Sequence, residues 1–389
     1  MTHRTFHRDR FTWLAYLSLA FYGYFLNGLG PITPFLKEEL QLTYTVSSFH
    51  FTAFAIGILL IGLGGHLVIQ RLGNQRSLWL GLFGMGLSAL LLLAGRNPII
   101  TIGASFLMGL IGSLILAIVP AALSDQHGEL KAVALSEANV IASLFATSAP
   151  LLVGWFAAAG AGWRLALGMM AGIPILMYLG LGKDPSSPTA TSISREPIES
   201  ARPLSSLFWL YWVAIILGVS VEFCMIFWSA NYVEQALGMS KAAAAQAVSL
   251  FLAAMIVGRV LGSRLVQRFS ARAIVIISIL MAGIGFLLFW KPVNNLAGLS
   301  GLFITGLGVA NLYPLILSLA INAADGNTVQ AGARATLASG TAILALPLAL
   351  GRLADAIGIT SAYGLVILLL AGVFFIIWMA GRISSVTHT

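Results

Sequence analysis

The stretch GHLVIQRLGNQR (residues 65–76) has a counterpart, GSRLVQRFSARA (residues 262–273), in the second half of the chain. The aligned identities are Gly65 with Gly262, Gln70 with Gln267 and Arg71 with Arg268, an offset of 262 − 65 = 197 residues. The same offset aligns other segments without a gap: Leu40 with Leu237, Phe106 with Phe303, Gly109 with Gly306, Pro150 with Pro347 and Gly154 with Gly351. A single register over separate segments indicates two copies of one structural unit.

The composition of the chain points to lipid as its main solvent. Of its 389 residues, 59% are hydrophobic and 9% are charged, and the mean hydropathy is +0.94. A soluble domain carries about 25% charged residues, so this chain cannot cover a globule of its size with polar side chains. The net charge is +8, but Lys and Arg stand at the ends of apolar runs and form no basic face for nucleic acid. The one cysteine excludes a disulfide within the chain and a cysteine-based metal site.

Apolar segments of about 20 residues, the length of a membrane-spanning helix, recur along the whole chain. We expect twelve spans, at 11–36, 45–69, 77–95, 99–123, 132–158, 163–182, 206–233, 241–267, 271–290, 295–322, 328–351 and 360–382. The first is read as a retained span and not as a signal peptide. The polar stretch 183–204 is rich in Ser, Pro and charge and is typical of a linker. The expected organisation is a six-helix bundle at 1–182, the linker at 183–204 and a second six-helix bundle at 205–389.

The orientation in the membrane follows from the basic residues. Lys and Arg are more frequent on the side of the membrane that holds both termini, and this bias marks the cytoplasmic side. We therefore expect a multi-pass protein of the cytoplasmic membrane with both ends in the cytoplasm. Parallel six-helix repeats of this kind are typical of secondary transporters.

The turn after the second span resembles the signature loop of the major facilitator superfamily, which is roughly G-x-L-A-D-R-x-G-R-R. The chain keeps Arg71, Gly73 and Arg76, whereas Gln70 stands in the place of Asp and His66 in the place of Gly. PLLVG (150–154), PLALG (347–351) and GRLADAIG (351–358) also resemble the superfamily. The stretches WSANYVEQALGMS (228–240) and VGRVLGSRL (257–265) are faintly similar to the fucose–proton symporters. The resemblance implies an all-α fold of two six-helix bundles around a cavity lined by spans 1, 4, 7 and 10.

Glu222 is the outstanding polar residue, because it is the one carboxylate in the apolar run GVSVEFCMIFWS (218–229). A charged group near the bilayer centre costs about 2.5–3.5 kcal/mol on insertion scales and is a functional candidate for that reason. We interpret Glu222 as a proton carrier. The alternative is an acid that stays protonated and holds two helices together.

Other polar residues are expected at similar depth. Asn27 and Asn311 could bind a hydroxylated or zwitterionic solute through their amides, or could equally join helices. Tyr22, Tyr24 and Trp228 could stack on a solute or serve only in packing. Asp355, at the outer end of the eleventh span, is expected to remain solvated.

Three charged residues near the inner helix ends are candidates for a gate. Glu137 and Arg334 occupy equivalent positions at the 197-residue offset, and Arg259 lies in the eighth span. In the superfamily, span 5 packs against span 8, so the resemblance implies a Glu137–Arg259 pair between the halves. The partner of Arg334 is open, and direct binding of an anionic solute by Arg259 or Arg334 is the competing interpretation.

The sequence thus favours a secondary active transporter of a small organic solute, working by alternating access. We expect coupling to protons, with sodium as the other ion to consider, and no bound cofactor or metal. No ATP-binding loop and no catalytic motif is found in the sequence, so neither an ATP-driven pump nor an enzyme is expected. A multidrug efflux antiporter is the alternative within transport, and a receptor without transport is the alternative outside it. The expected partners are the solute and the lipid bilayer, and the expected state is a monomer.

Overall fold

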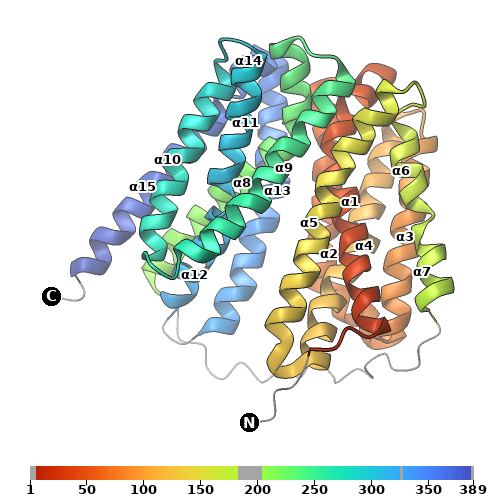
Figure 1. Ribbon diagram of the computed structural model, residues 1–389, viewed down its shortest axis with the longest axis horizontal. Coiled ribbons are helices and arrows are strands. Elements are labelled where there is room, and N and C mark those ends of the chain that lie inside the picture. The colour runs from red at the N-terminus through yellow and green to blue at the C-terminus, as the bar shows by residue number, and fades with distance from the viewer. Residues whose placement is uncertain (1–5, 183–203, 325–326, 387–389) are drawn as a thin grey trace. The chain divides into compact units, whose positions relative to one another are not determined.

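The computed structural model describes residues 6–182, 204–324 and 327–386, which are almost entirely helical (Figure 1). The expected linker, 183–204, lies outside the described residues except for its last position. The chain divides into two compact units, Met1–Ile32 with Ala53–Arg195 and Thr33–Thr52 with Glu196–Thr389. The end of the first helix and the start of the second therefore pack within the second unit, although both belong to the first half of the sequence.

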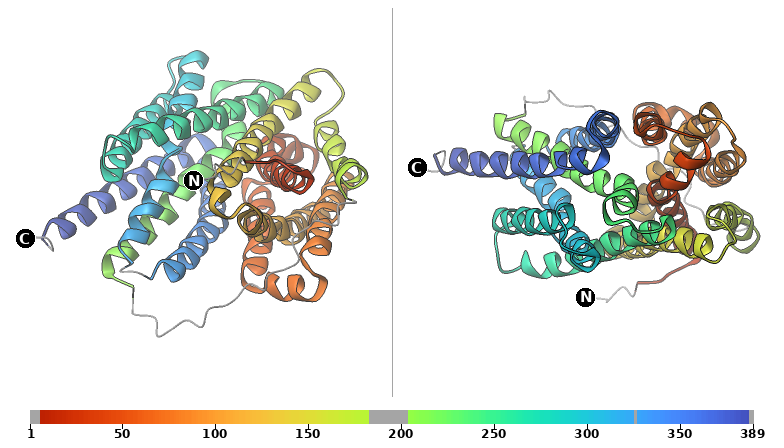
Figure 2. Two further views of the ribbon diagram at one scale, coloured as in Figure 1. Left: turned by 60° about the horizontal axis from the view of Figure 1, so that its bottom comes forward. Right: turned by 90° about the horizontal axis from the view of Figure 1, so that it is seen from above.

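Helices follow one another with short connections throughout the first half of the chain. They are α1 (Arg10–Glu39), α2 (Tyr44–Leu72), α3 (Asn74–Ala94), α4 (Pro98–His127), the 3₁₀ turn η1 (Gly128–Leu130), α5 (Lys131–Ala158), α6 (Arg164–Ala171) and α7 (Ile173–Leu181). Within the first unit, α3 packs against α4 on one side and against α6 and α7 on another (Figures 1 and 2).

The second half begins at α8, which packs against most of the other helices of its unit. The helices are α8 (Ser206–Leu237), α9 (Lys241–Leu265), α10 (Ala271–Trp290), α11 (Asn295–Val309), α12 (Leu312–Asn322), α13 (Thr328–Ile357), α14 (Ile359–Ala362) and α15 (Leu365–Val386). The neighbours of α8 are α9, α12, α13 and α15, and α11 packs between α9 and α10 (Figure 1).

Ten stretches of helix in the described part of the chain are long and apolar enough to cross a membrane. One of them, Pro98–Ala158, is 61 residues long and contains both α4 and α5. Large apolar side chains also cover the outside of the helices: Leu87 is 70% exposed and Ile284 is 67% exposed. An apolar surface of this kind suits lipid as solvent. The expected fold class, an all-α membrane protein, is therefore confirmed.

Two of the expected spans are broken in the structure. The break between α11 and α12 falls at Ala310 and Asn311. Pro314 has no N–H, so the carbonyl group of Ala310 loses its usual donor four residues later. The sixth span is interrupted at Gly172, just before Pro174 in the first turn of α7. Proline breaks of this kind are tolerated in membrane helices because neighbouring groups satisfy the freed backbone.

The internal repeat is visible in the packing of glycines. In the first unit, a Cβ on Gly109 would collide with the backbone of Phe54, and in the second unit a Cβ on Gly306 would collide with the backbone of Phe251. The two pairs are related by the same offset, since 306 − 109 = 197 and 251 − 54 = 197. In each unit, an equivalent pair of helices is therefore in close backbone contact at an equivalent glycine: α2 with α4 in the first unit and α9 with α11 in the second.

Candidate functional site

Glu222 lies near the middle of α8, and its closest charged partner is Arg259 on α9. The Oε1 atom of Glu222 is 3.7 Å from a terminal nitrogen of Arg259. The Glu222 side chain is 17% exposed and the Arg259 side chain is 47% exposed. A separation of 3.7 Å is too long for a hydrogen bond, so the two groups attract each other as charges without being locked together.

Arg259 keeps its hydrogen-bonding capacity. Its guanidinium group carries five N–H donors, and within the described residues the Glu222 carboxylate is its one charged neighbour. A half-exposed guanidinium group with unused donors is well suited to a carboxylate or phosphate, which it can bind with two parallel hydrogen bonds. The pair therefore combines an acid that can exchange a proton with a cation that can bind an anionic group.

The sequence paired Arg259 with Glu137 across the two units, and that pairing stays a prediction; within its own unit each residue has another partner. Glu137, on α5, accepts hydrogen bonds from Nε of Arg8 at 2.8 Å and from a terminal nitrogen of Arg8 at 2.5 Å. The Tyr16 hydroxyl donates a third hydrogen bond at 3.1 Å. Arg8 lies two residues before α1 and reaches the second turn of α5 within the same unit. Each member of the predicted pair thus has a partner inside its own unit.

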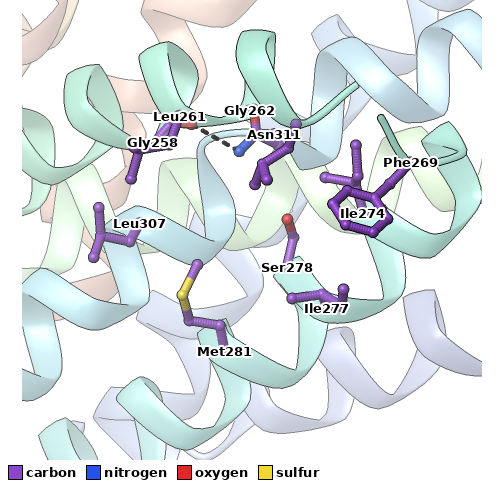
Figure 3. Close-up of a pocket in the computed structure, with 11 residues that line it drawn as sticks. Gly258, Leu261, Gly262, Phe269, Ile274, Ile277, Ser278, Met281, Leu307 and Asn311 are labelled. Carbon is purple, nitrogen blue, oxygen red and sulfur yellow. Dashed lines mark hydrogen bonds between the residues drawn. The ribbon is translucent and has the colours of Figure 1, made fainter. Parts of the chain in front are cut away.

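Asn311 holds the backbone beside Arg259. At the break between α11 and α12, the Asn311 amide donates a hydrogen bond of 2.9 Å to the carbonyl oxygen of Gly258 on α9 (Figure 3). Gly258 is the residue before Arg259, so Asn311 fixes the position of the guanidinium-bearing turn. Gly262, one turn later, packs directly on the Asn311 side chain, and a Cβ there would overlap it. Of the two interpretations of Asn311, this geometry favours joining helices.

The Gly262–Asn311 contact gives the first prediction. Gly262→Ala should destabilise the protein by about 1–3 kcal/mol, the usual cost of overpacking a close contact, measured by thermal unfolding in detergent. Gly283→Ala on α10 is the matched control, because a Cβ there meets nothing within 4 Å. That control should be neutral or slightly stabilising, since Ala favours a helix more than Gly. Equal unfolding temperatures for the two variants would show that the contact is unimportant.

The remaining polar candidates on α1 are occupied in packing. The Asn27 amide donates to the carbonyl oxygen of Gly23 in its own helix at 2.9 Å. The Tyr24 hydroxyl donates to the carbonyl oxygen of Ala166 at 2.9 Å, and its ring is fully buried. The Tyr22 hydroxyl is buried near Ser113 without reaching hydrogen-bond geometry to a described residue. Glu222 and Arg259 are therefore the predicted residues that the structure brings together, and those on α1 belong to the other unit.

Trp228 is fully buried in the second unit. Its indole N–H donates to the carbonyl oxygen of Pro347 on α13 at 3.0 Å. Its ring stands edge-on to Phe51, which in turn stacks on Phe227 with ring centres 4.1 Å apart. All of these contacts hold α8 to α13 and to the start of α2, so Trp228 serves in packing.

Replacing the indole tests this role. Trp228→Phe should keep the aromatic packing, lose the bond to Pro347, and lower the free energy of unfolding by about 1 kcal/mol. The affinity for a transported solute should stay unchanged, because the indole does not face a free surface. Thermal unfolding and solute titration of the same preparation measure both quantities. A large loss of affinity with unchanged stability would instead place Trp228 at the solute.

The signature-loop residues form the turn between α2 and α3. Gly73 alone separates the two helices and has φ +80°, a conformation that favours glycine. Gln70, Arg71 and Arg76 are exposed, as is Arg268 at the equivalent turn after α9, whereas Gly65 and Gly262 are buried. Arg334 is also exposed, and its carbonyl oxygen accepts a hydrogen bond of 2.8 Å from the Trp212 indole.

One functional candidate escaped the sequence analysis. Asp355 on α13 accepts hydrogen bonds of 2.8 Å from the backbone N–H groups of Tyr44 and Thr45, the first residues of α2. It is thus a helix cap supplied from another helix, and its side chain is exposed as expected. Lys37 lies over the Tyr44 ring and Glu38 pairs with Lys241, so the end of α1 is held in the same unit. No sequence pattern could have linked residues 310 positions apart.

Comparisons with known proteins place the chain in a family. The sequence profile of the Major Facilitator Superfamily matches residues 15–336. The chain belongs to this superfamily. An uncharacterized MFS-type transporter from Yersinia pestis is 24% identical over 365 residues, covering 89% of this chain and 91% of that protein. The resemblance found in the sequence is confirmed.

Solved structures with the same fold include other transporters of the superfamily. A bacterial homologue of the human lysosomal transporter Spinster, inward-facing and occupied, gives a TM-score of 0.79 at 13% identity, over 97% of this chain and 98% of that one. The fucose:proton symporter of E. coli gives 0.61 at 18% identity, over 95% and 98%. At these low sequence identities, the matches show only that the folds are similar. As a member of the superfamily, the chain is a multi-pass membrane protein with the fold of a secondary transporter.

Proposed function

We propose that the protein moves a small organic solute across the cytoplasmic membrane by alternating access and couples this movement to protons. The twelve spans and the two six-helix bundles belong to the proposal. They are supported by the helix bounds, by the glycine contacts that recur at the 197-residue offset, and by membership of the superfamily. The distribution of Lys and Arg supports cytoplasmic termini.

The observation that carries the proposal is the Glu222–Arg259 pair at 3.7 Å. When Glu222 is ionised, it neutralises Arg259 and competes with any other anion for the guanidinium group. When Glu222 takes up a proton, Arg259 loses its counter-charge and attracts an anionic group of a solute. Protonation of Glu222 therefore strengthens the binding of an anionic solute at Arg259. By the same linkage, solute binding favours the protonated form of Glu222. This reciprocal effect is what a symporter requires.

The same pair indicates the class of solute. Arg259 suits a carboxylate or phosphate better than an uncharged sugar, because its donors match the oxygens of an anion in pairs. A cationic drug would meet Glu222 with Arg259 already beside it, and the guanidinium group would repel it. The geometry thus disfavours the multidrug alternative. Glu222 remains the proposed proton carrier and Arg259 the proposed anion-binding residue.

A panel of labelled solutes tests the proposal. Sugars, amino acids, organic acids and cationic drugs are first compared by thermal shift at two pH values. The compounds that stabilise the protein are then followed into proteoliposomes under an imposed proton or sodium gradient. We expect an organic anion to accumulate with the proton gradient alone. Accumulation driven by sodium, or accumulation of cationic drugs, would overturn the coupling or the solute class. Ligand binding without flux would indicate a receptor.

A further inference from the structure

A groove opens between the inner ends of α9 and α10, separate from the Glu222–Arg259 pair. Its volume is about 240 Å³. The walls are mainly apolar and include Leu261, Phe269, Ile277, Met281 and Leu307 (Figure 3). Leu265 also lines the groove. Its floor is the break between α11 and α12, where Asn311 is already bonded to Gly258. The groove therefore lies beside the break between α11 and α12, where α9 connects to α10.

The side chains around the groove are exposed. Leu261 is 49% exposed and Ile277 is 60% exposed, and the neighbouring Val257 and Leu280 are 44% and 52% exposed. In a protein that spans a membrane, exposed apolar side chains on spanning helices contact acyl chains. The groove is smaller than the roughly 300–1,000 Å³ typical of sites for drug-sized molecules. Its size and lining suit a length of hydrocarbon chain.

Two arginines at the end of α9 adjoin lining residues of the groove in the sequence. Arg264 directly precedes the lining residue Leu265, and Arg268 directly precedes the lining residue Phe269. Both side chains are exposed, and neither forms an ion pair with another residue in the part of the chain that the structure describes. A third basic residue, Arg272, donates to the Trp378 carbonyl oxygen on α15 and so has a partner within the unit. Arg264 and Arg268 therefore provide positive charge beside an apolar groove.

We propose that this groove binds an anionic phospholipid, with one acyl chain between α9 and α10 and the phosphate at Arg264 and Arg268. Basic residues where helices emerge from the membrane attract anionic lipid headgroups, and here they adjoin a recess that can hold part of the chain. The lipid would hold the inner end of α9, the helix that also carries Arg259. The proposal needs the chain to lie in a membrane but is independent of which solute it carries.

Lipid retention by the purified full-length protein tests the site. Native mass spectrometry in detergent measures how much phosphatidylglycerol and how much phosphatidylcholine with the same acyl chains remain bound. Leu261→Trp should block the groove and lower the bound phosphatidylglycerol about tenfold, since keeping about two CH₂ groups of the acyl chain out of the groove costs about that factor. Val260→Trp is the matched control, because Val260 is also 49% exposed but does not line the groove. It should leave lipid binding unchanged.

The headgroup is tested separately with Arg264→Gln combined with Arg268→Gln. These are exposed surface positions, so the fold should tolerate the change. The double variant should retain phosphatidylglycerol no better than phosphatidylcholine. Equal binding of both lipids by the wild-type protein would overturn the proposal, as would equal loss in Leu261→Trp and Val260→Trp. An undiminished preference for phosphatidylglycerol in the arginine variant would also overturn it.

Discussion

Glu222→Gln should abolish accumulation of the solute under a proton gradient while exchange of labelled for unlabelled solute continues. Glutamine imitates the protonated acid in shape and charge, so Arg259 stays free to bind an anion in every state. The variant can then bind and release solute on both sides, but it carries no proton and cannot draw energy from the gradient. The measurement is uptake and counterflow in the same proteoliposomes, and uptake should stop when the inside and outside concentrations are equal.

A second carboxylate on the same helix provides the control for this prediction. Glu234 lies three turns further along α8, and its carboxylate is 3.9 Å from the Lys241 ammonium group. Glu234→Gln should keep gradient-driven accumulation, because removing that charge leaves the Glu222–Arg259 pair intact. If Glu222→Gln still accumulates solute, Glu222 is structural and the proposed coupling fails. If both variants lose accumulation, loss of charge on α8 in general is the cause, and the assignment to Glu222 is wrong.

The start of α2 should become accessible when its distant cap is removed. Asp355→Ala deletes the acceptor of two backbone hydrogen bonds at 2.8 Å. The loss of a helix cap costs about 0.5–2 kcal/mol, which corresponds to a rise of about 2- to 30-fold in the population of opened molecules. Ser48 is the reporter, because it is fully buried against Gly351. A Ser48→Cys protein should therefore react faster with a membrane-impermeant thiol reagent when Asp355 is also changed to Ala.

Labelling of the native cysteine should be slow, and a control variant on the same helix is available. The native cysteine, Cys224, is buried and should react slowly. Arg352→Gln alters an exposed charge one turn from Asp355 on the same helix without touching the cap, so it should leave the labelling rate of Ser48→Cys unchanged. Identical rates with and without Asp355→Ala would show that the cap does not hold α2 closed.

Much of the fold could be predicted from local patterns in the sequence. Hydropathy located the helices, because a helix in lipid must satisfy its own backbone and present apolar side chains, both properties of the segment itself. The repeat at 197 residues indicated a doubled architecture, and the glycine contacts Gly109–Phe54 and Gly306–Phe251 recur at that spacing. Glu222 stood out for the same local reason, since a carboxylate in an apolar run is costly wherever it lies.

The sequence could not show which groups form hydrogen bonds with the polar side chains. Asn311 and Trp228 were candidates for solute binding, yet their donors are used by the carbonyl oxygens of Gly258 and Pro347. Neither acceptor is recognisable in a sequence, because every residue has a backbone carbonyl and only packing decides which one is left without a donor. Asp355 was missed for the same reason, since the N–H groups that it caps belong to a helix start far away in the chain.

The sequence by itself determined that the chain is a helical membrane protein, where its helices run, and that Glu222 is an exceptional residue. These conclusions rest on the interaction of each segment with its solvent. The tertiary structure decided that Arg259 faces Glu222, that Glu137 is bound by Arg8, and that Asn311 holds the turn next to Arg259. Such choices depend on which side chains packing brings within a few ångströms, because hydrogen bonds form only at those distances and charge attraction is strongest there.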